Sequence, residues 1–339
     1  MFERKDLEAL AAFSGTHPVT SLYLNMPPRF RTTPEAYRTR LKGLLKSISG
    51  RAPAGDTEAL ENFFDKEFDW MGRGVAVFSA QSDGLWEVVP LTVPLRHSSI
   101  HVADKPFILP LVNLMDTYEA ITVAIVDQQA LRMLHFHLGE LADSVTLEGE
   151  EVKRFKSGGG AAGRARGDEL DGHRHETVKG NLKDFASALS AFGSRHNPDH
   201  ILLGGSEPTC QKFKAVMSQP YASRIEGMFT ISFRAPEAEI LTQSLETIQE
   251  NEEAAEQHLV ETIQTAAAKE SNGVVGLKKT LAALESGRVQ TLAVVENYLN
   301  PEDVDAAVTK AVDYGGDVKF VNPDSPLATA EGIGALLRY

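Results

Sequence analysis

The chain of 339 residues contains a single cysteine, Cys210. One cysteine cannot close an internal disulfide and cannot supply a cysteine-based zinc site, so both kinds of framework are excluded. We expect Cys210 to be a small residue that is buried or lies on a helix surface.

The sequence also lacks an uninterrupted apolar run that is long enough to span a bilayer. Its opening residues, MFERKDLEAL, contain no apolar segment of the kind that secretory signals carry. Internal repeats and low-complexity segments are absent as well. Together with the charged fraction of 24%, these absences predict a soluble, cytoplasmic, globular protein with no membrane partner. A chain of this length is expected to fold as two or three domains.

Positive charge is scarce in the last third of the chain. Residues 1–117 carry 13 basic and 14 acidic side chains, residues 118–235 carry 14 and 15, and residues 236–339 carry 7 and 18. The last third therefore holds −11 of the net charge of −13. Such a segment repels a phosphate backbone, so we expect it to bind a protein, with a merely solvated acidic surface as the alternative.

Apolar periodicity predicts strands and helices in all three parts of the chain, and this alternation favours an α/β fold with several domains. The first part contains predicted strands and helices at Val19–Met26, Glu35–Ile48 and Thr57–Met71, a hairpin around Ser82–Gly84, and a connecting helix in DKPFILPLVNLMDT. The second contains strands in AITVAIVD and ALRMLHFHLGEL, a helix in ETVKGNLKDFASALSAFGSRH, a strand and turn in DHILLGGSEP, and a helix in QKFKAVM. The third contains a helix at Glu237–Ala268, a helix in GLKKTLAALESG, a strand in VQTLAVVEN, a helix in PEDVDAAVTKAVDYGG and a strand in DVKFVN.

Two strand ends carry residues that are compatible with phosphate or metal chemistry. The paired glycines of DHILLGGSEP could hold a phosphate at a helix N-terminus. No Gly-x-Gly-x-x-Gly pattern and no Walker motif completes them, so a structural tight turn is favoured. Asp127 ends a buried strand and could belong to a carboxylate pair, but no second carboxylate stands at a matching strand end.

Histidines form two close pairs. His173 and His175 have a spacing that is seen in metal sites, although their polar surroundings favour a solvated loop. His135 and His137 alternate along a strand, where we expect half-buried, hydrogen-bonded side chains rather than ligands. We therefore expect neither a metal nor a cofactor.

The segment VKRFKSGGGAAGRARG, residues 152–167, contains five glycines, five basic residues and no acidic residue. Consecutive glycines let a backbone approach another molecule closely, and basic side chains contact phosphates. We expect a loop that its partner orders, with a flexible surface connection as the alternative. The predicted phosphate contacts are Lys153, Arg154, Lys156, Arg164 and Arg166.

Several stretches, in order along the chain, resemble the archaeo-eukaryotic class I release factor and Pelota superfamily, and most closely its bacterial branch. The chain ends in EGIGALLRY, which is similar to the Gly-Ile-Gly-Gly-Ile-Leu-Arg-Tyr end of that superfamily. GLKKTLAALESGRVQTLAVVEN resembles a segment of its C-terminal domain, DHILLGGSEP and TVAIVDQQALRMLHFHLGEL resemble its central domain, and VTSLYLNMPP resembles its first strand.

The resemblance implies three domains: an N-terminal α+β domain over residues 1–117, a central domain over 118–235 and a C-terminal domain over 236–339. The central domain is expected to be RNase H-like, and the C-terminal one an L7Ae/L30e-like α/β/α sandwich. In the superfamily the C-terminal domain binds a translational GTPase, which agrees with the acidity of residues 236–339.

The resemblance also gives the glycine-rich segment a role. Peptide-releasing members carry Gly-Gly-Gln-Ser-Ala-x-Arg here. Gly158 and Gly159 match the two glycines and Arg164 matches the arginine, but Gly160 replaces the glutamine and Ala161 replaces the serine. A glycine keeps the main-chain N–H that stabilises negative charge on the ester, yet it loses the side chain that positions water. The N-terminal domain also lacks the Asn-Ile-Lys-Ser motif that the resemblance would place between its helices for stop-codon reading. The nearest stretch, LLKSISG, falls in a predicted helix, so stop-codon reading is not expected.

Three functions follow from these observations. The first is a non-decoding factor that binds the ribosome, through rRNA and A-site or P-site tRNA, in rescue, stress or hibernation, and does not bind DNA. The replacement of the glutamine by Gly160 weighs against an enzyme without excluding one. The second is a peptidyl-tRNA hydrolase that uses the main-chain N–H groups of Gly158–Gly160. The third is a non-ribosomal adaptor that binds proteins through its acidic C-terminal domain.

Overall fold

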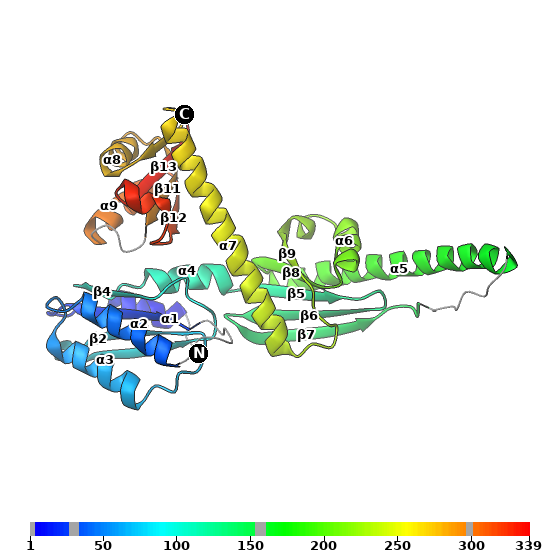
Figure 1. Cartoon of the computed structure of the whole chain (residues 1–339), viewed down its shortest axis with the longest axis horizontal. Helices are drawn as coiled ribbons and strands as arrows, with labels where there is room; N and C mark the ends of the chain where they lie inside the picture. Colours follow the sequence, from blue (N-terminus) through cyan, green and yellow to red (C-terminus); the bar gives the residue numbers. More distant parts are fainter. Residues whose placement is uncertain (1–3, 27–33, 153–160, 296–300) are drawn as a thin grey trace. The chain divides into compact units, whose positions relative to one another are not determined.

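The computed structural model describes residues 4–26, 34–152, 161–295 and 301–339 (Figure 1). It is a mixed α/β protein with three sheets, as the alternation of strands and helices predicts. Its residues form two compact units, one made of Met1–Ile108 with Glu252–Tyr339 and the other of Leu109–Asn251. Within the described ranges, each helix is too short or too polar to cross a lipid bilayer.

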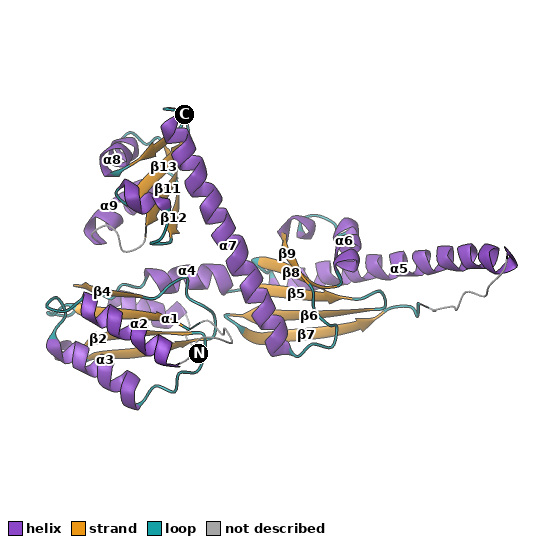
Figure 2. Ribbon diagram, viewed as in Figure 1, coloured by secondary structure: helices purple, strands orange, loops and turns teal. Residues whose placement is uncertain are grey.

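The first sheet belongs to the N-terminal part of the first unit and is antiparallel, with the strand order β3-β2-β1-β4. Figure 2 draws its strands in orange and labels β2 and β4. Its strands are β1 (Val19–Asn25), β2 (Gly74–Ala80), β3 (Leu85–Leu91) and β4 (Ser99–Ala103). The helices of this part are α1 (Arg4–Ala12), α2 (Pro34–Ser47) and α3 (Ala54–Lys66). Apolar side chains of α2 and α3, including Leu41 and Phe64, pack against β1 and β2.

Helix α3 ends at Lys66, five residues before the predicted end at Met71. Trp70 explains the difference, because its ring packs 5.7 Å from that of Phe64. In a continued helix two residues that are six positions apart lie on different faces, so this contact requires the helix to end.

The second sheet lies in the second unit and has the order β7-β6-β5-β8-β9. Its strands are β5 (Ile121–Val126), β6 (Ala130–His137), β7 (Glu140–Glu148), β8 (His200–Gly205) and β9 (Ile225–Phe229). Strands β5, β6 and β7 are antiparallel, whereas β5, β8 and β9 run parallel. The helices are α4 (Leu109–Tyr118), α5 (Ala161–His196) and α6 (Glu207–Val216), and a 3₁₀ turn at Tyr221–Arg224 precedes β9.

Helix α5 packs on this sheet through one apolar stripe. The buried members of the stripe are Val178, Leu182, Phe185, Leu189 and Phe192. The predicted helix begins at Glu176, but α5 begins 15 positions earlier, at Ala161. Its leading part runs past the strands of the sheet in Figure 1.

The third sheet has the order β10-β13-β11-β12. Its strands are β10 (Gly273–Val275), β11 (Val289–Val295), β12 (Asp317–Val321) and β13 (Ile333–Leu337), and its helices are α7 (Glu237–Ala268), α8 (Leu277–Glu285) and α9 (Pro301–Asp313). Alternate residues of β11 face opposite sides: Leu292 and Val294 pack in the core with α8 and α9, and Ala293 and Val295 pack in the core with α7. Helices therefore cover both faces of this sheet.

Candidate functional site

The glycine-rich segment follows β7, and its last part, residues 161–167, forms the start of α5. Six of the predicted site residues fall outside the described residues: Lys153, Arg154, Lys156, Gly158, Gly159 and Gly160. Arg164 and Arg166 lie on α5 rather than in a loop, which corrects the prediction for these two positions. Alanine and arginine are among the best helix formers, so the run from Ala161 to Arg166 favours a helix despite its one glycine.

Asn181 of α5 holds the chain at the point where it enters this segment. Its side chain is 3% exposed. The side-chain oxygen accepts a hydrogen bond from the main-chain N–H of Glu150 at 2.8 Å. The side-chain nitrogen donates to the carbonyl of Glu150 at 2.9 Å and to the carbonyl of Gln128 at 3.0 Å. A buried amide with this many partners fixes the strand exit to the helix.

Gln129 adds a second attachment. Its side-chain nitrogen donates to the carbonyl of Val152 at 3.0 Å, and its own carbonyl accepts from the N–H of Gly149 at 2.8 Å. The preceding Gln128 accepts a hydrogen bond from Arg174 of α5 at 3.3 Å through its side chain. We call the connected set the loop-root clamp, and its members are Gln128, Gln129, Gly149, Glu150 and Asn181.

Gly149 is required by the packing of this clamp. A Cβ built on it would lie 2.6 Å from the side-chain oxygen and the amide carbon of Asn181. Real Cβ atoms do not approach so closely, so any other residue would displace the amide from its three hydrogen bonds. The sequence shows Gly149 and Asn181 only as ordinary polar and turn residues, which is why the clamp was not predicted.

The first histidine pair lies on α5, not in the predicted solvated loop. His173 and His175 are both exposed. Residues two positions apart on a helix do not face each other, so this spacing does not bring the two rings together. Among the described side chains, no group of three or more His, Cys, Asp or Glu residues has the geometry of a metal site.

The second pair supports the structural interpretation for His135. This ring is buried, and its Nδ1 lies 3.0 Å from the hydroxyl of Thr122. It stacks at 4.4 Å on the ring of His196, whose Nε2 lies 2.9 Å from a carboxylate oxygen of Asp143. Burial first, and then the charges of His196 and His137, lower the pKa of His135 from 6.5 to about 4, against an opposing effect of Asp143. His135 therefore stays neutral at physiological pH.

The paired glycines, Gly204 and Gly205, end β8 and lead into α6. Gly205 has φ of 140°, and a Cβ there would lie 2.5 Å from the carbonyl oxygen of Val126. Its sequence neighbour Ser206 then occupies the N-cap position of α6. The glycine thus has a steric role, which supports the tight-turn interpretation.

Asp127 is exposed, and its carboxylate accepts a hydrogen bond from the N–H of Gln129 at 3.3 Å.

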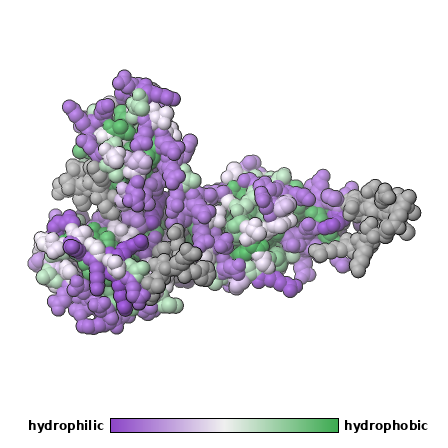
Figure 3. All heavy atoms as spheres, viewed as in Figure 1, coloured by the Kyte–Doolittle hydropathy of each residue, from purple (hydrophilic) through white to green (hydrophobic). Residues whose placement is uncertain are grey.

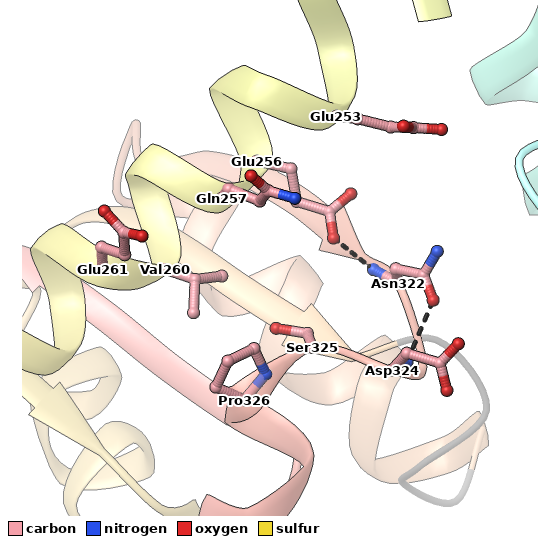
Figure 4. Close-up of a pocket in the computed structure, with 9 residues that line it drawn as sticks. All are labelled: Glu253, Glu256, Gln257, Val260, Glu261, Asn322, Asp324, Ser325 and Pro326. Carbon is pink, nitrogen blue, oxygen red and sulfur yellow. Dashed lines mark hydrogen bonds between the residues drawn. The ribbon is translucent and has the colours of Figure 1, made fainter. Parts of the chain in front are cut away.

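A pocket of about 300 Å³ lies between α7 and the chain that follows β12 (Figure 4). Its acidic lining residues are Glu253, Glu256, Glu261 and Asp324. The carboxylate of Glu256 accepts from the N–H of Asn322 at 2.6 Å. Hydrophilic side chains also predominate along α7 in Figure 3. The sequence predicted that residues 236–339 are acidic, but not the pocket, since its second wall comes from a turn more than 60 residues later.

Arg96 joins this acidic surface from the N-terminal part of the same unit. Its guanidinium donates to the carboxylate of Glu252 at 2.6 Å and to the carbonyl of Phe320 at 3.0 Å, and it lies 3.8 Å from the carboxylate of Glu256. Because Arg96 and Glu252 are each 35% exposed, water screens the pair, and we expect it to contribute little to stability.

Residues 106–249 match the sequence profile of bacterial archaeo-eukaryotic release factor family 10. The resemblance that the sequence motifs indicate is thereby confirmed for this central segment. A search of curated proteins finds no match to the chain.

Solved structures to which this chain is similar come from archaea and yeast. A model of ribosome-bound archaeal Pelota and ABCE1 is 15% identical with a TM-score of 0.45, over 99% of this chain and 94% of the other. Dom34 of S. cerevisiae, a translation termination-like factor involved in RNA quality control, is 11% identical with a TM-score of 0.48, over 78% and 79%. The archaeal translation termination factor aRF1 is 18% identical with a TM-score of 0.29, over 100% and 99%.

Proposed function

From the match of residues 106–249 to a bacterial release-factor family, we propose that this protein is a release-factor-like factor that binds the ribosome without decoding stop codons. The proposed factor acts in the cytoplasm, in ribosome rescue, stress or hibernation. It contacts rRNA and the tRNA in the A or P site. The observation that carries the proposal is the loop-root clamp, because it fixes the chain that enters the basic glycine-rich segment to the core of the matched segment.

The basic side chains of this segment contact RNA phosphates. They are Lys153, Arg154, Lys156, Arg164 and Arg166. Phosphate contacts position a protein on RNA and supply most of its salt-dependent affinity. Gly158–Gly160 give the backbone a close approach to the ribosome or the tRNA.

A sucrose-gradient experiment tests the proposal. The full-length protein and a variant with Lys153, Arg154, Lys156, Arg164 and Arg166 changed to glutamine are compared in extracts of growing and starved cells. The wild type is expected to travel with ribosomes, and the variant to stay at the top of the gradient. A matched control changes five exposed basic residues of the N-terminal part to glutamine and thus makes the same change in net charge: Arg38, Arg40, Lys42, Lys46 and Arg51.

Equal sedimentation of the wild type and the loop variant would contradict the proposed role of the segment. Loss of ribosome binding in the control variant alone would assign binding to α2 and the residues that follow it instead. If the wild type does not sediment with ribosomes in either condition, the ribosomal function itself is wrong.

A second candidate function is peptidyl-tRNA hydrolysis, in which the main-chain N–H of Gly160 stabilises the developing oxyanion. The replacement of glutamine by Gly160 removes the side chain that positions water, so we place this activity second. Release of a labelled peptide from P-site tRNA by the purified protein would establish it. Substitution of Gly160 by proline removes the N–H and should abolish that release.

The acidic pocket supports a protein partner for the C-terminal part. We propose that residues 236–339 form an L7Ae/L30e-like domain that binds a basic surface of a translational GTPase. We also propose that residues 1–117 form an α+β domain and that residues 118–235 form an RNase H-like domain. The carboxylates of Glu253, Glu256 and Glu261 favour cationic partner side chains. If the protein does not bind the ribosome, it would instead be a non-ribosomal adaptor that binds its protein partner through the same acidic surface. Changing these three residues to glutamine should weaken the binding of the partner but leave the sedimentation of the purified protein with isolated ribosomes unchanged.

A further inference from the structure

Strand β10 forms one edge of the third sheet, where β13 is its neighbour in the strand order. Two main-chain hydrogen bonds bracket this pairing: the N–H of Gly276 donates to Ile333 at 2.9 Å, and the N–H of Leu337 donates to Asn272 at 2.8 Å. In an antiparallel ladder, hydrogen-bonded and non-bonded residue pairs alternate. The main-chain N–H and C=O groups of Val274 therefore face β13. The same groups of Gly273 and Val275 point to the open edge of the sheet.

Val275 is partly exposed on this edge, whereas Gly273 is buried, so the N–H and C=O of Val275 are the groups that another chain can reach. Among the described residues, no main-chain group hydrogen-bonds to the N–H or the C=O of Gly273 or Val275. An edge strand with such groups is a template on which a second strand can pair.

A groove of about 540 Å³ follows this edge. One side comes from the end of α7, through Gln264, Ala267 and Ala268. Helix α7 packs directly against the strand, because a Cβ built on Gly273 would lie 2.6 Å from the Cβ of Ala266. The alanines at the border leave room for the side chains of a bound peptide.

Two cations line the other side of the groove, Lys279 of α8 and Arg288. Residues 236–339 contain only 7 basic residues against 18 acidic ones. The groove is lined by these two cations and one acidic residue, Glu270, so the sign of the charge is locally reversed. Arg288 donates to the carbonyl of Tyr339 at 2.9 Å, while its Nε is buried with no hydrogen-bond partner among the described residues. A buried guanidinium N–H without a partner favours an anionic group nearby.

We propose that the open edge of β10 binds an extended peptide segment of a partner protein, and that an acidic side chain of this segment pairs with Lys279 and Arg288. The peptide adds a fifth strand to the sheet by hydrogen bonds to the N–H and C=O of Val275. Because β10 is three residues long, the main-chain contribution is small and the acidic side chain sets the specificity. This site is separate from the acidic pocket, which favours cations, and it does not depend on ribosome binding.

Fluorescence anisotropy with two labelled peptides tests the proposal on the full chain. Both peptides are nine residues long and alternate threonine and valine, and the central residue is aspartate in one and lysine in the other. Saturable binding of the aspartate peptide, and none of the lysine peptide, is expected. Lys279→Gln and Arg288→Gln should each weaken the binding about tenfold, consistent with the loss of one charge-assisted hydrogen bond.

Val275→Pro tests the main-chain pairing. Proline removes the outward N–H of residue 275, but the bonds of β10 to β13 remain, so the variant should fold and bind the aspartate peptide several-fold more weakly. Lys278→Gln is the matched control, since Lys278 is exposed beside Lys279 but does not line the groove. It should leave binding unchanged, and the thermal midpoint of each variant checks its fold.

Wild-type affinity in Lys279→Gln, Arg288→Gln and Val275→Pro would overturn the proposal, and so would equal binding of the two peptides. A second copy of this chain is the other possible occupant. A concentration-dependent dimer in sedimentation that Val275→Pro dissociates would assign the edge to self-association, and would likewise overturn it.

Discussion

The side chain of Asn181 hydrogen-bonds both main-chain polar groups of Glu150, at 2.8 Å to the N–H and at 2.9 Å to the carbonyl. A residue of the sheet edge is thus paired with a helix side chain as it would be with a neighbouring strand. Glu150 lies two residues beyond Glu148, the last residue of β7, so this pairing extends the hydrogen bonding of the strand past its end. The basic segment therefore starts from a fixed point of the fold.

Asn181→Asp should destabilise the protein at neutral pH. The carboxylate still accepts from the N–H of Glu150, but it faces the two carbonyl oxygens to which the amide donates. We expect a loss of about 1–3 kcal/mol in the free energy of unfolding, because buried acceptors are left without donors. Urea denaturation followed by circular dichroism measures the loss. Lys183→Asp, at an exposed position of the same helix, is the control and should change stability by less than about 0.5 kcal/mol.

Gly149→Ala and Gly180→Ala should have opposite effects. A Cβ at residue 149 would lie 2.6 Å from the Asn181 side chain, so the first change should cost about 1–3 kcal/mol. No atom lies within 4 Å of a Cβ at residue 180, within α5, so the second should stabilise by up to about 1 kcal/mol. Thermal unfolding of the two variants checks both signs, and a neutral Gly149→Ala would contradict the packing described for the clamp.

Stability should fall as pH decreases from 6.5 to about 4, in part through His135. Burial lowers the pKa of this ring in the folded state, so the unfolded chain binds more protons in that window and acid favours unfolding. His101, whose pKa burial also lowers to about 4, adds to the same slope. His135→Gln should reduce the slope without removing it. Urea midpoints measured between pH 4 and 7 test this, and an unchanged slope in a folded variant would mean that His135 does not titrate as described.

Ribosome binding should weaken with salt in proportion to the number of phosphate contacts. If the five basic residues of the glycine-rich segment each contact one phosphate, neutralising all five should reduce the slope of log affinity against log salt by roughly 3 to 4. Affinities measured by filter binding at several potassium concentrations give both slopes. Identical slopes, even with different affinities, would show that these side chains do not contact phosphates.

The sequence predicts the central strands well because their burial is continuous. AITVAIVD and VQTLAVVEN are almost wholly apolar, and they become β5 and β11, the interior strands of their sheets. Strand β10 was not predicted, since three residues with a glycine give no periodicity. Strand β13 likewise entered the prediction only as part of a family motif, not as a strand.

The clamp and the early start of α5 lie beyond what periodicity can show. Asn181 precedes Leu182 of the apolar stripe and has the sequence pattern of an ordinary boundary residue. Its role depends on Gln128 and Glu150, which are distant in the sequence and which the sheet brings together. The leading part of α5 has no apolar stripe, so its helical state rests on residue propensity rather than on a hydrophobic pattern.

Residues inserted into helix α5 would change both the direction of the segment that precedes it and the distance of that segment from the sheet, and the number of inserted residues would set the two separately. Its 36 residues form one continuous helix that is fixed to the sheet from Val178 onward. One residue inserted before that point would turn everything upstream by about 100° and move it about 1.5 Å along the axis. Four inserted residues would nearly restore the original direction and extend the helix by about 6 Å. A short series of such insertions would therefore report whether the target is sensitive to the phase of this helix or only to its reach.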